Sequence, residues 1–154
     1  MTVAPRTKAG ANELRFAQIM QKSTSDTPLQ GKRRFSSGDV SISVDQSLEH
    51  EGVSYLIEID SANMAKLLVG QYVLLNQLNG NEKEKSFFLV VHTFKNYNPQ
   101  RTLNNLQLVN EQLYEGVGIK FGAMHINALE QWQGDFSEFK ALITMPNPSF
   151  KRDA

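Results

Sequence analysis

Apolar and polar residues alternate along residues 39–46, so that the apolar side chains face one way while Asp39 and the other polar side chains face the opposite way. This period of two predicts a strand. Residues 53–60 (VSYLIEID) predict a second strand, and the polar segment EHEG at 49–52 lies between the two. We therefore expect 39–46 and 53–60 to pair with each other as a hairpin.

Apolar residues recur with helical spacing in four further stretches of the chain. The expected helices cover residues 12–22, 63–78, 98–116 and a last stretch that begins at 135. Two of them open with capping signals, because Asn98 precedes Pro99 and Asp135 stands three residues before Glu138. Nearly continuous apolar runs predict buried strands. These runs are 87–94 and 119–126, and residues 32–35 are expected to add a short edge strand.

The order of elements is α-β-β-β-α-β-α-β-α, which predicts an α/β (α+β) domain with a mixed central sheet of about five strands and flanking helices. One such domain is expected to cover residues 11–145. Residues 1–10 and 146–154 are polar and contain prolines, so we expect a disordered tail and a flexible tail there.

The composition excludes several classes of site. The chain has no cysteine, which rules out disulfides, a thiol nucleophile and cysteine-ligated zinc. It contains no G-x-S-x-G, no dinucleotide-binding glycine motif and no P-loop. No apolar run approaches the roughly 20 residues of a membrane helix. No signal peptide is visible either, so we expect a cytoplasmic protein that does not contact a membrane.

Charge is unevenly distributed although the net charge is zero. Basic residues dominate before residue 35, whereas residues 39–60 contain only acidic charges. Lys32, Arg33, Arg34 and Arg101 are the candidate contacts to nucleic-acid phosphates, since lysine and arginine supply most of such binding energy. Overall neutrality argues against strong, nonspecific binding to DNA or RNA. The alternative is a solvated basic tail followed by a solvated acidic hairpin.

Several carboxylates can converge on one face of the expected hairpin. Glu58 and Asp60 lie two residues apart on one strand, and Asp39 and Asp45 share a face of its neighbour. Converging carboxylates repel each other unless a hard cation or a proton joins them. Water bound to Mg²⁺ at such a site can attack a phosphodiester. The alternative is a solvent-facing strand whose last aspartate caps the following helix.

Residues 13–94 resemble the PD-(D/E)XK nucleases, the restriction-endonuclease-like superfamily, in the sequence of an early helix, a strand meander, a crossover helix and a further strand. In that family one acid opens a strand and an acid-x-lysine motif closes the next. The resemblance matches Asp39 with the first acid and Glu58-Ile59-Asp60 with the motif, so that Asp60 replaces the lysine.

This resemblance implies a divergent nuclease-like domain that binds DNA or RNA and has a Mg²⁺-dependent phosphodiesterase site. Asp39 and Glu58 would hold the metal. Asp60, Lys66 and Gln71 complete the candidate catalytic residues, since Lys66 can reach back from the next helix and Gln71 falls where some members carry a glutamine.

Two other functions stay open. Residues 147–154 (NPSFKRDA) resemble the translated recombination sites that end integron gene-cassette products. That resemblance implies a bacterial mobile gene, and it favours a non-catalytic interaction module such as an immunity or accessory protein, with a protein partner or as a homodimer. A third hypothesis is a small-molecule pocket lined by His92 and His125, which lie inside apolar strands.

Overall fold

The computed structural model describes residues 10–147 of the 154-residue chain. The tails expected at 1–10 and 146–154 therefore lie outside the described residues, apart from Gly10 and residues 146 and 147. The strands are β1 (Arg33–Ser37), β2 (Val40–Val44), β3 (Gln46–His50), β4 (Val53–Asp60), β5 (Ser86–His92) and β6 (Lys120–His125). The helices are α1 (Ala11–Met20), α2 (Ala65–Leu78), α3 (Pro99–Tyr114) and α4 (Phe136–Leu142), with short 3₁₀ turns η1 (Gly80–Lys85) and η2 (Ile126–Leu129).

The main sheet has the strand order β3-β4-β5-β6 and is mixed in direction. β3 pairs with β4 in the antiparallel sense, whereas β4, β5 and β6 are parallel to one another. Parallel neighbours need a crossover connection, and helices α2 and α3 supply the two crossovers. The mixed α/β architecture that the sequence predicts is therefore present, although the described strands form one four-stranded and one two-stranded sheet.

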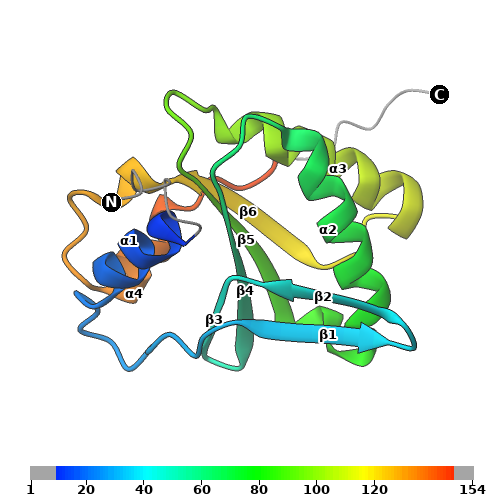
Figure 1. Ribbon diagram of the computed structural model, residues 1–154, viewed down its shortest axis with the longest axis horizontal. Helices are drawn as coiled ribbons and strands as arrows, with labels where there is room; N and C mark the ends of the chain where they lie inside the picture. Colours follow the sequence, from blue (N-terminus) through cyan, green and yellow to red (C-terminus); the bar gives the residue numbers. More distant parts are fainter. Residues whose placement is uncertain (1–9, 148–154) are drawn as a thin grey trace, which may run out of the picture.

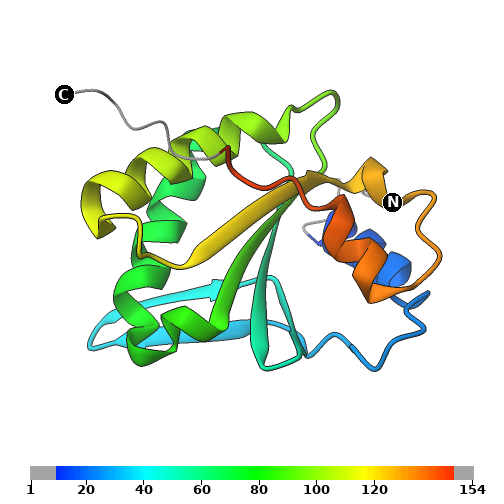
Figure 2. The same ribbon diagram turned by 180° about the vertical axis from the view of Figure 1, so that it is seen from behind.

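Helices cover both faces of this sheet. Figures 1 and 2 show α1 and α4 side by side on one face and α2 and α3 on the other. The strands alternate accordingly, because successive side chains point to opposite faces. In β5, for example, Leu89 and Val91 join the core under α1 and α4, while Phe88 and Val90 join the core under α2 and α3. All four side chains are completely buried, which explains the continuous apolar run.

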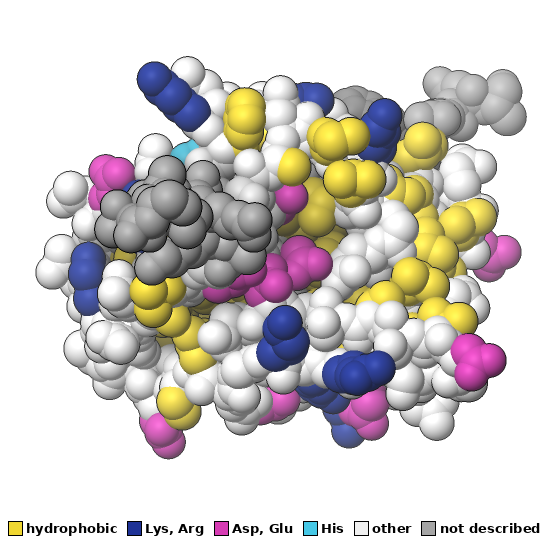
Figure 3. All heavy atoms as spheres, viewed as in Figure 1, with side chains coloured by type: hydrophobic (Ala, Val, Ile, Leu, Met, Phe, Trp, Pro, Cys, Tyr) yellow, Lys and Arg dark blue, Asp and Glu magenta, His cyan; other side chains and the backbone are white. Residues whose placement is uncertain are grey.

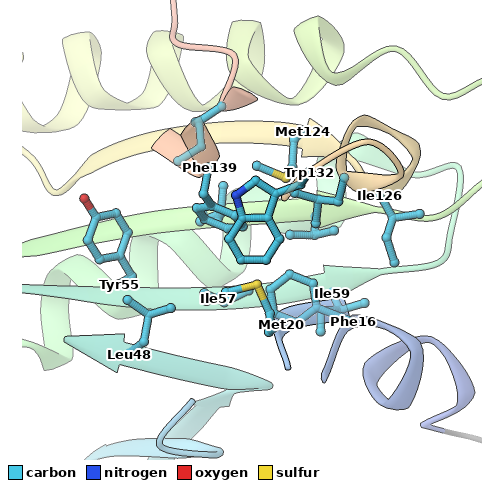
Figure 4. Packing of buried hydrophobic residues seen from close by; sticks show 14 of the residues in the cluster. Phe16, Met20, Leu48, Tyr55, Ile57, Ile59, Met124, Ile126, Trp132 and Phe139 are labelled. Carbon is cyan, nitrogen blue, oxygen red and sulfur yellow. The ribbon is translucent and has the colours of Figure 1, made fainter. Parts of the chain in front are cut away.

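The core under α1 and α4 is rich in aromatic residues. Figure 4 shows Phe16 and Met20 of α1 close to Ile59, and Trp132 in the middle of the cluster. Trp132 is almost fully buried, and its indole N–H donates to the backbone oxygen of Asp135 at 2.7 Å. Burial of a large apolar side chain contributes about 1.5–3 kcal/mol, so this cluster fixes the first and last helices of the domain against the sheet.

The prediction that residues 39–46 and 53–60 pair with each other as one hairpin is wrong. Residues 40–50 form two strands that meet at Asp45, of which β2 pairs with β1 and only β3 pairs with β4. Gly38 and Asp39 make the two-residue loop between β1 and β2, and Gly38 adopts a positive φ of 58°. The β1–β2 hairpin then packs on the α2 side of the sheet, where Phe35 and Val44 join the core.

The remaining elements follow the sequence pattern closely. Asn98 caps α3 through a bond from the Gln100 N–H, and Pro99 occupies the first helical position. Asp135 caps α4 by accepting the backbone N–H of Glu138 at 3.1 Å. Within residues 10–147, no helix combines the length and the hydropathy that crossing a bilayer requires.

Candidate functional site

Asp39 does not meet the other carboxylates. It is exposed in the loop between β1 and β2, and the whole of β2 separates it from Asp45. At about 3.3 Å per residue, this extended segment spans about 20 Å. The expected convergence of Asp39 with Glu58 is therefore wrong, because it assumed that the strand carrying Asp39 pairs with β4 along its whole length.

Asp45 lies next to Glu58 instead. The pairing of Gln46 with Ile57 brings Asp45, at the junction of β2 and β3, alongside the C-terminal end of β4. The Oδ2 atom of Asp45 accepts the backbone N–H of Ile59 at 2.8 Å. This bond fixes the aspartate where the two strands separate, and both carboxylates are half-buried.

The pKa of Glu58 shows how close the two acids are. Burial, a hydrogen bond to Asp45 and the negative charge of Asp45 raise the pKa of Glu58 to about 9, and Asp60 adds a further negative charge. Burial disfavours the charged form of a carboxylate, and a neighbouring negative charge acts in the same direction. At neutral pH the Asp45–Glu58 pair therefore retains a proton that a divalent cation can displace.

Asp60 has a different neighbour, His92. The two residues face each other across the parallel strands β4 and β5, with Asp60 Oδ2 and His92 Nδ1 3.3 Å apart. His92 is completely buried and its Nε2 atom lies 2.8 Å from the hydroxyl of Thr102 on α3. Thr102 in turn bonds the hydroxyl of Tyr97, whose ring stacks on the imidazole at 3.9 Å. A chain of polar groups thus connects Asp60 to the interior.

The Asp60–His92 contact is incomplete. Asp60 Oδ2 and His92 Nδ1 are buried atoms with no partner of proper hydrogen-bond geometry. Because His92 is fully buried and bonded on its other nitrogen, it does not line an open pocket with His125, as the small-molecule hypothesis requires. His125 lies beside His92 in the sheet and contacts the backbone oxygen of Phe94 at 2.9 Å.

Gln71 and Lys66 both lie on α2, but their side chains have different surroundings. The Gln71 amide donates to the backbone oxygen of Ser43 at 2.9 Å, so it fastens α2 to β2. Lys66 is exposed in the first turn of α2 and lines a hollow with Arg101. The described contacts place neither side chain against the Asp45–Glu58 pair.

The four candidate phosphate contacts do not form one surface. Arg33 lies 3.9 Å from Glu49, which pairs with Ser54 near the start of β4, whereas Arg101 bonds Asn63 just after the end of β4. Six residues of β4 separate these positions, or about 20 Å. Arg34 bonds Ser41 at 2.9 Å. Figure 3 shows acidic side chains near the middle of this face, with basic side chains beside them over β1.

Divalent-metal binding can be tested against these positions. Among residues 10–147, no group of three or more histidine or acidic side chains is arranged to hold a metal ion. Mg²⁺, however, is often bound by one or two carboxylates and completes its octahedron with water and substrate phosphate. The Asp45–Glu58 pair supplies the two neighbouring carboxylates that this second kind of site uses.

Sequence reasoning missed two parts of this arrangement. Asp45 was grouped with Asp39 on a strand face, although the two-residue Gly38–Asp39 loop was readable as a hairpin signal. The contact of His92 with Asp60 had no local signal, since it depends on the register of β5 against β4. No protein-family model matches the chain, and neither a curated protein nor a solved structure is detectably similar to it.

Proposed function

We propose that the chain is a divergent, nuclease-like domain of the cytoplasm that binds nucleic acid and holds Mg²⁺ between Asp45 and Glu58. The observation that carries this proposal is the pair itself. Two half-buried carboxylates meet where two adjacent strands separate, and the pKa of Glu58 rises to about 9. Such a pair is destabilised at neutral pH unless it keeps a proton or binds a cation.

The order of strands supports the assignment to the PD-(D/E)XK superfamily. An early helix, the hairpin β1–β2, the antiparallel pair β3–β4, the crossover helix α2 and the parallel strand β5 occur in that order. An acid directly precedes β3, as in the family once Asp45 replaces Asp39 as the first acid, and Glu58 stands where the family motif that closes the next strand has its acid. The departure is Asp60, which stands where the family carries lysine and faces His92.

The proposed chemistry divides among these residues. Bound Mg²⁺ supplies a Lewis acid and an activated water for phosphodiester hydrolysis. Asp45, which is fixed by the N–H of Ile59, and Glu58 would hold the cation, and Glu58 would be deprotonated when it is bound. Asp60 is kept beside His92 and is not needed as a ligand.

The test is a metal titration followed by thermal melting. We expect Mn²⁺ or Mg²⁺ to raise the Tm of the full chain, and to do so more at pH 8 than at pH 6, because metal and proton compete for Glu58. Glu58→Gln and Asp45→Asn should each remove the shift, whereas Glu130→Gln, an exposed glutamate after η2, should leave it unchanged. A shift that survives Glu58→Gln contradicts the proposal, as does the absence of a shift in the wild type.

Hydrolysis is tested separately with supercoiled DNA and with single-stranded RNA in the presence of Mg²⁺. Cleavage that Glu58→Gln abolishes supports an enzyme. Metal binding without cleavage supports a nucleic-acid-binding domain that has lost catalysis, which the replacement of lysine by Asp60 makes the natural alternative.

A second function, a non-catalytic interaction module, is favoured by one observation. Met64 and Leu67 on α2 and Val40 on β2 are exposed by 42%, 59% and 47%. Figure 3 shows apolar side chains continuing over α2 and the β1–β2 hairpin. Clusters of exposed apolar side chains often mark interfaces. Light scattering of the wild type and of Leu67→Gln distinguishes the cases, since a homodimer through this surface should dissociate in the variant.

A further inference from the structure

A hollow of about 510 Å³ lies between the N-terminal turns of α2 and α3, close to the end of β4. Five of its seven lining residues are polar or basic, namely Asn63, Lys66, Arg101, Asn104 and Asn105, and the other two are Met64 and Ala65. None of these residues is acidic. The lining therefore differs in charge from the Asp45–Glu58 pair, and no residue belongs to both.

Two asparagines of this hollow have their side-chain oxygens engaged. The side-chain oxygen of Asn63 accepts a bond from Arg101 at 2.6 Å, and that of Asn104 accepts a bond from the Gln100 amide at 2.8 Å. Each of these asparagines also carries an amide group with two N–H donors, which can bind an anion.

The positive charges of the hollow have no acidic partner in the part of the chain that the structure describes. Within residues 10–147, neither Lys66 nor Arg101 has a carboxylate oxygen within 4.0 Å. Arg101 is nevertheless held in place, because it bonds Asn63 and its guanidinium lies over the Tyr97 ring at 5.2 Å from the centroid. A positioned guanidinium loses little freedom when it binds an anion, which favours tight contacts.

The start of α2 adds a further contribution. Its N-cap residue is Met64, and no side chain caps the helix. The first N–H groups of an uncapped helix attract negative charge. The N–H of Leu67 bonds the Met64 oxygen at 3.1 Å, whereas Ala65 and Lys66, the first two residues of α2, line the hollow.

We propose that this hollow binds a phosphoryl group, with Lys66 and Arg101 as the charged contacts and Asn63 and Asn104 as amide donors. Because Asn63 follows Glu58 by five residues, their Cα atoms lie at most about 18 Å apart. A nucleic-acid strand of several nucleotides carries charges over that length, so the hollow and the Asp45–Glu58 pair lie within reach of one strand. The identity of the polymer rests on the proposed function, but the phosphoryl site does not.

The experiment measures oligonucleotide binding by fluorescence anisotropy in EDTA, so that no cation at Asp45 and Glu58 is involved. The probes are a single-stranded oligothymidylate with a 5′-phosphate, the same strand with a 5′-hydroxyl, and inorganic phosphate as a competitor. The variants are Lys66→Gln and Arg101→Gln. Both side chains are exposed, so we expect folding to be retained, and Tm values check this. Lys22→Gln, an exposed lysine just after α1, is the matched control.

We expect each variant to weaken binding about tenfold, the usual effect of one charge-assisted contact. The slope of log affinity against log salt should fall by about 0.7 for each lost phosphate contact. Preference for the phosphorylated strand, lost in the variants, identifies a terminal phosphate. Equal binding of both strands, with equal losses, identifies the phosphodiester backbone.

Other results overturn the proposal. These are wild-type affinity in both variants, a loss in Lys22→Gln as large as in Arg101→Gln, or no binding of any probe to the wild type. The two proposals can fail separately, because the metal titration depends on Glu58 and the EDTA measurement does not. A metal-linked rise in Tm without oligonucleotide binding would leave the carboxylate site and remove the phosphoryl site.

Discussion

Glu58 and Asp60 stand two residues apart on the same face of β4, yet the fold gives them opposite neighbours. Glu58 lies next to Asp45, which directly precedes the antiparallel neighbour β3. Burial and the negative charge of Asp45 raise the pKa of Glu58 to about 9. Asp60 meets His92 from the parallel strand β5, at 3.3 Å. The difference comes from the two neighbours of β4, since β3 pairs with it in the antiparallel sense and β5 in the parallel sense.

The two acids therefore differ in the groups that they contact at this end of the sheet. Asp60 is tied to a buried network that reaches Tyr97 through His92 and Thr102, so it serves the architecture of the β4, β5 and α3 junction. Glu58 is bonded to another acid, Asp45, and under the proposed function it exchanges its proton for a cation. Perturbed carboxylates of this kind concentrate at functional sites.

The largest expected effect is at His92, the buried neighbour of Asp60. His92→Ala should destabilise the protein by about 4 kcal/mol, because it opens a cavity under Tyr97 and removes the hydrogen bond between His92 and the buried hydroxyl of Thr102. Urea denaturation of the full chain measures this loss. The control is His125→Ala on the neighbouring strand, a half-exposed histidine for which we expect about 1 kcal/mol. Equal losses of stability at the two histidines would show that the network through His92 contributes no more to stability than the contacts of His125.

The second largest effect is expected at Glu58, where the substitution should stabilise the protein. In EDTA at pH 8, Glu58→Gln should stabilise the protein by about 2 kcal/mol, because a neutral amide replaces an acid that must otherwise hold a proton beside Asp45. The raised pKa means that the folded state binds this proton more tightly than the unfolded state. The stabilisation from protonated Glu58 is therefore complete below pH 4.5 and is lost as pH rises through about 9.

The measurement is a series of urea curves between pH 5 and pH 9. The wild type should lose up to about 1.4 kcal/mol per pH unit from this one group, and Glu58→Gln should lose nothing from it. Glu130→Gln provides the control at an exposed position. Parallel pH profiles for the wild type and Glu58→Gln would show that Glu58 is ionised in the fold, contrary to the proposed pair.

Local patterns predicted most elements of this fold because their signals are local. The apolar run of β5, the Asn98–Pro99 start of α3 and the Asp135 cap of α4 each lie within a few residues of the structure they specify. The pairing of strands was the part that failed. Residues 40–50 read as one alternating strand and a turn, and which neighbour each half takes depends on the two-residue loop at Gly38–Asp39 and on burial of Phe35.

The same limit, the pairing of strands, applies to the residues of the candidate site. Glu58 and Asp60 were found from their spacing on one strand, which is a local property. Their partners were not, because Asp45 is brought to Glu58 by the register of β3 against β4, and His92 is brought to Asp60 by the register of β5. The choice of Asp39 over Asp45 was an error of strand pairing rather than of chemistry.

The smallest effect is the one that tests the comparison most directly. Asp60→Asn is the same acid-to-amide change as Glu58→Gln, two residues further along β4, but it should destabilise the protein by about 1 kcal/mol at pH 7. The amide keeps the volume of the side chain and removes the negative charge that faces the buried Nδ1 of His92. Urea denaturation measures the change, and Glu51→Gln is the control, since Glu51 lies 3.6 Å from His50 at an exposed position where such a pair contributes nothing measurable. If Asp60→Asn stabilises the protein as Glu58→Gln does, both carboxylates belong to one repulsive cluster, and the division between a structural and a cation-binding acid is wrong.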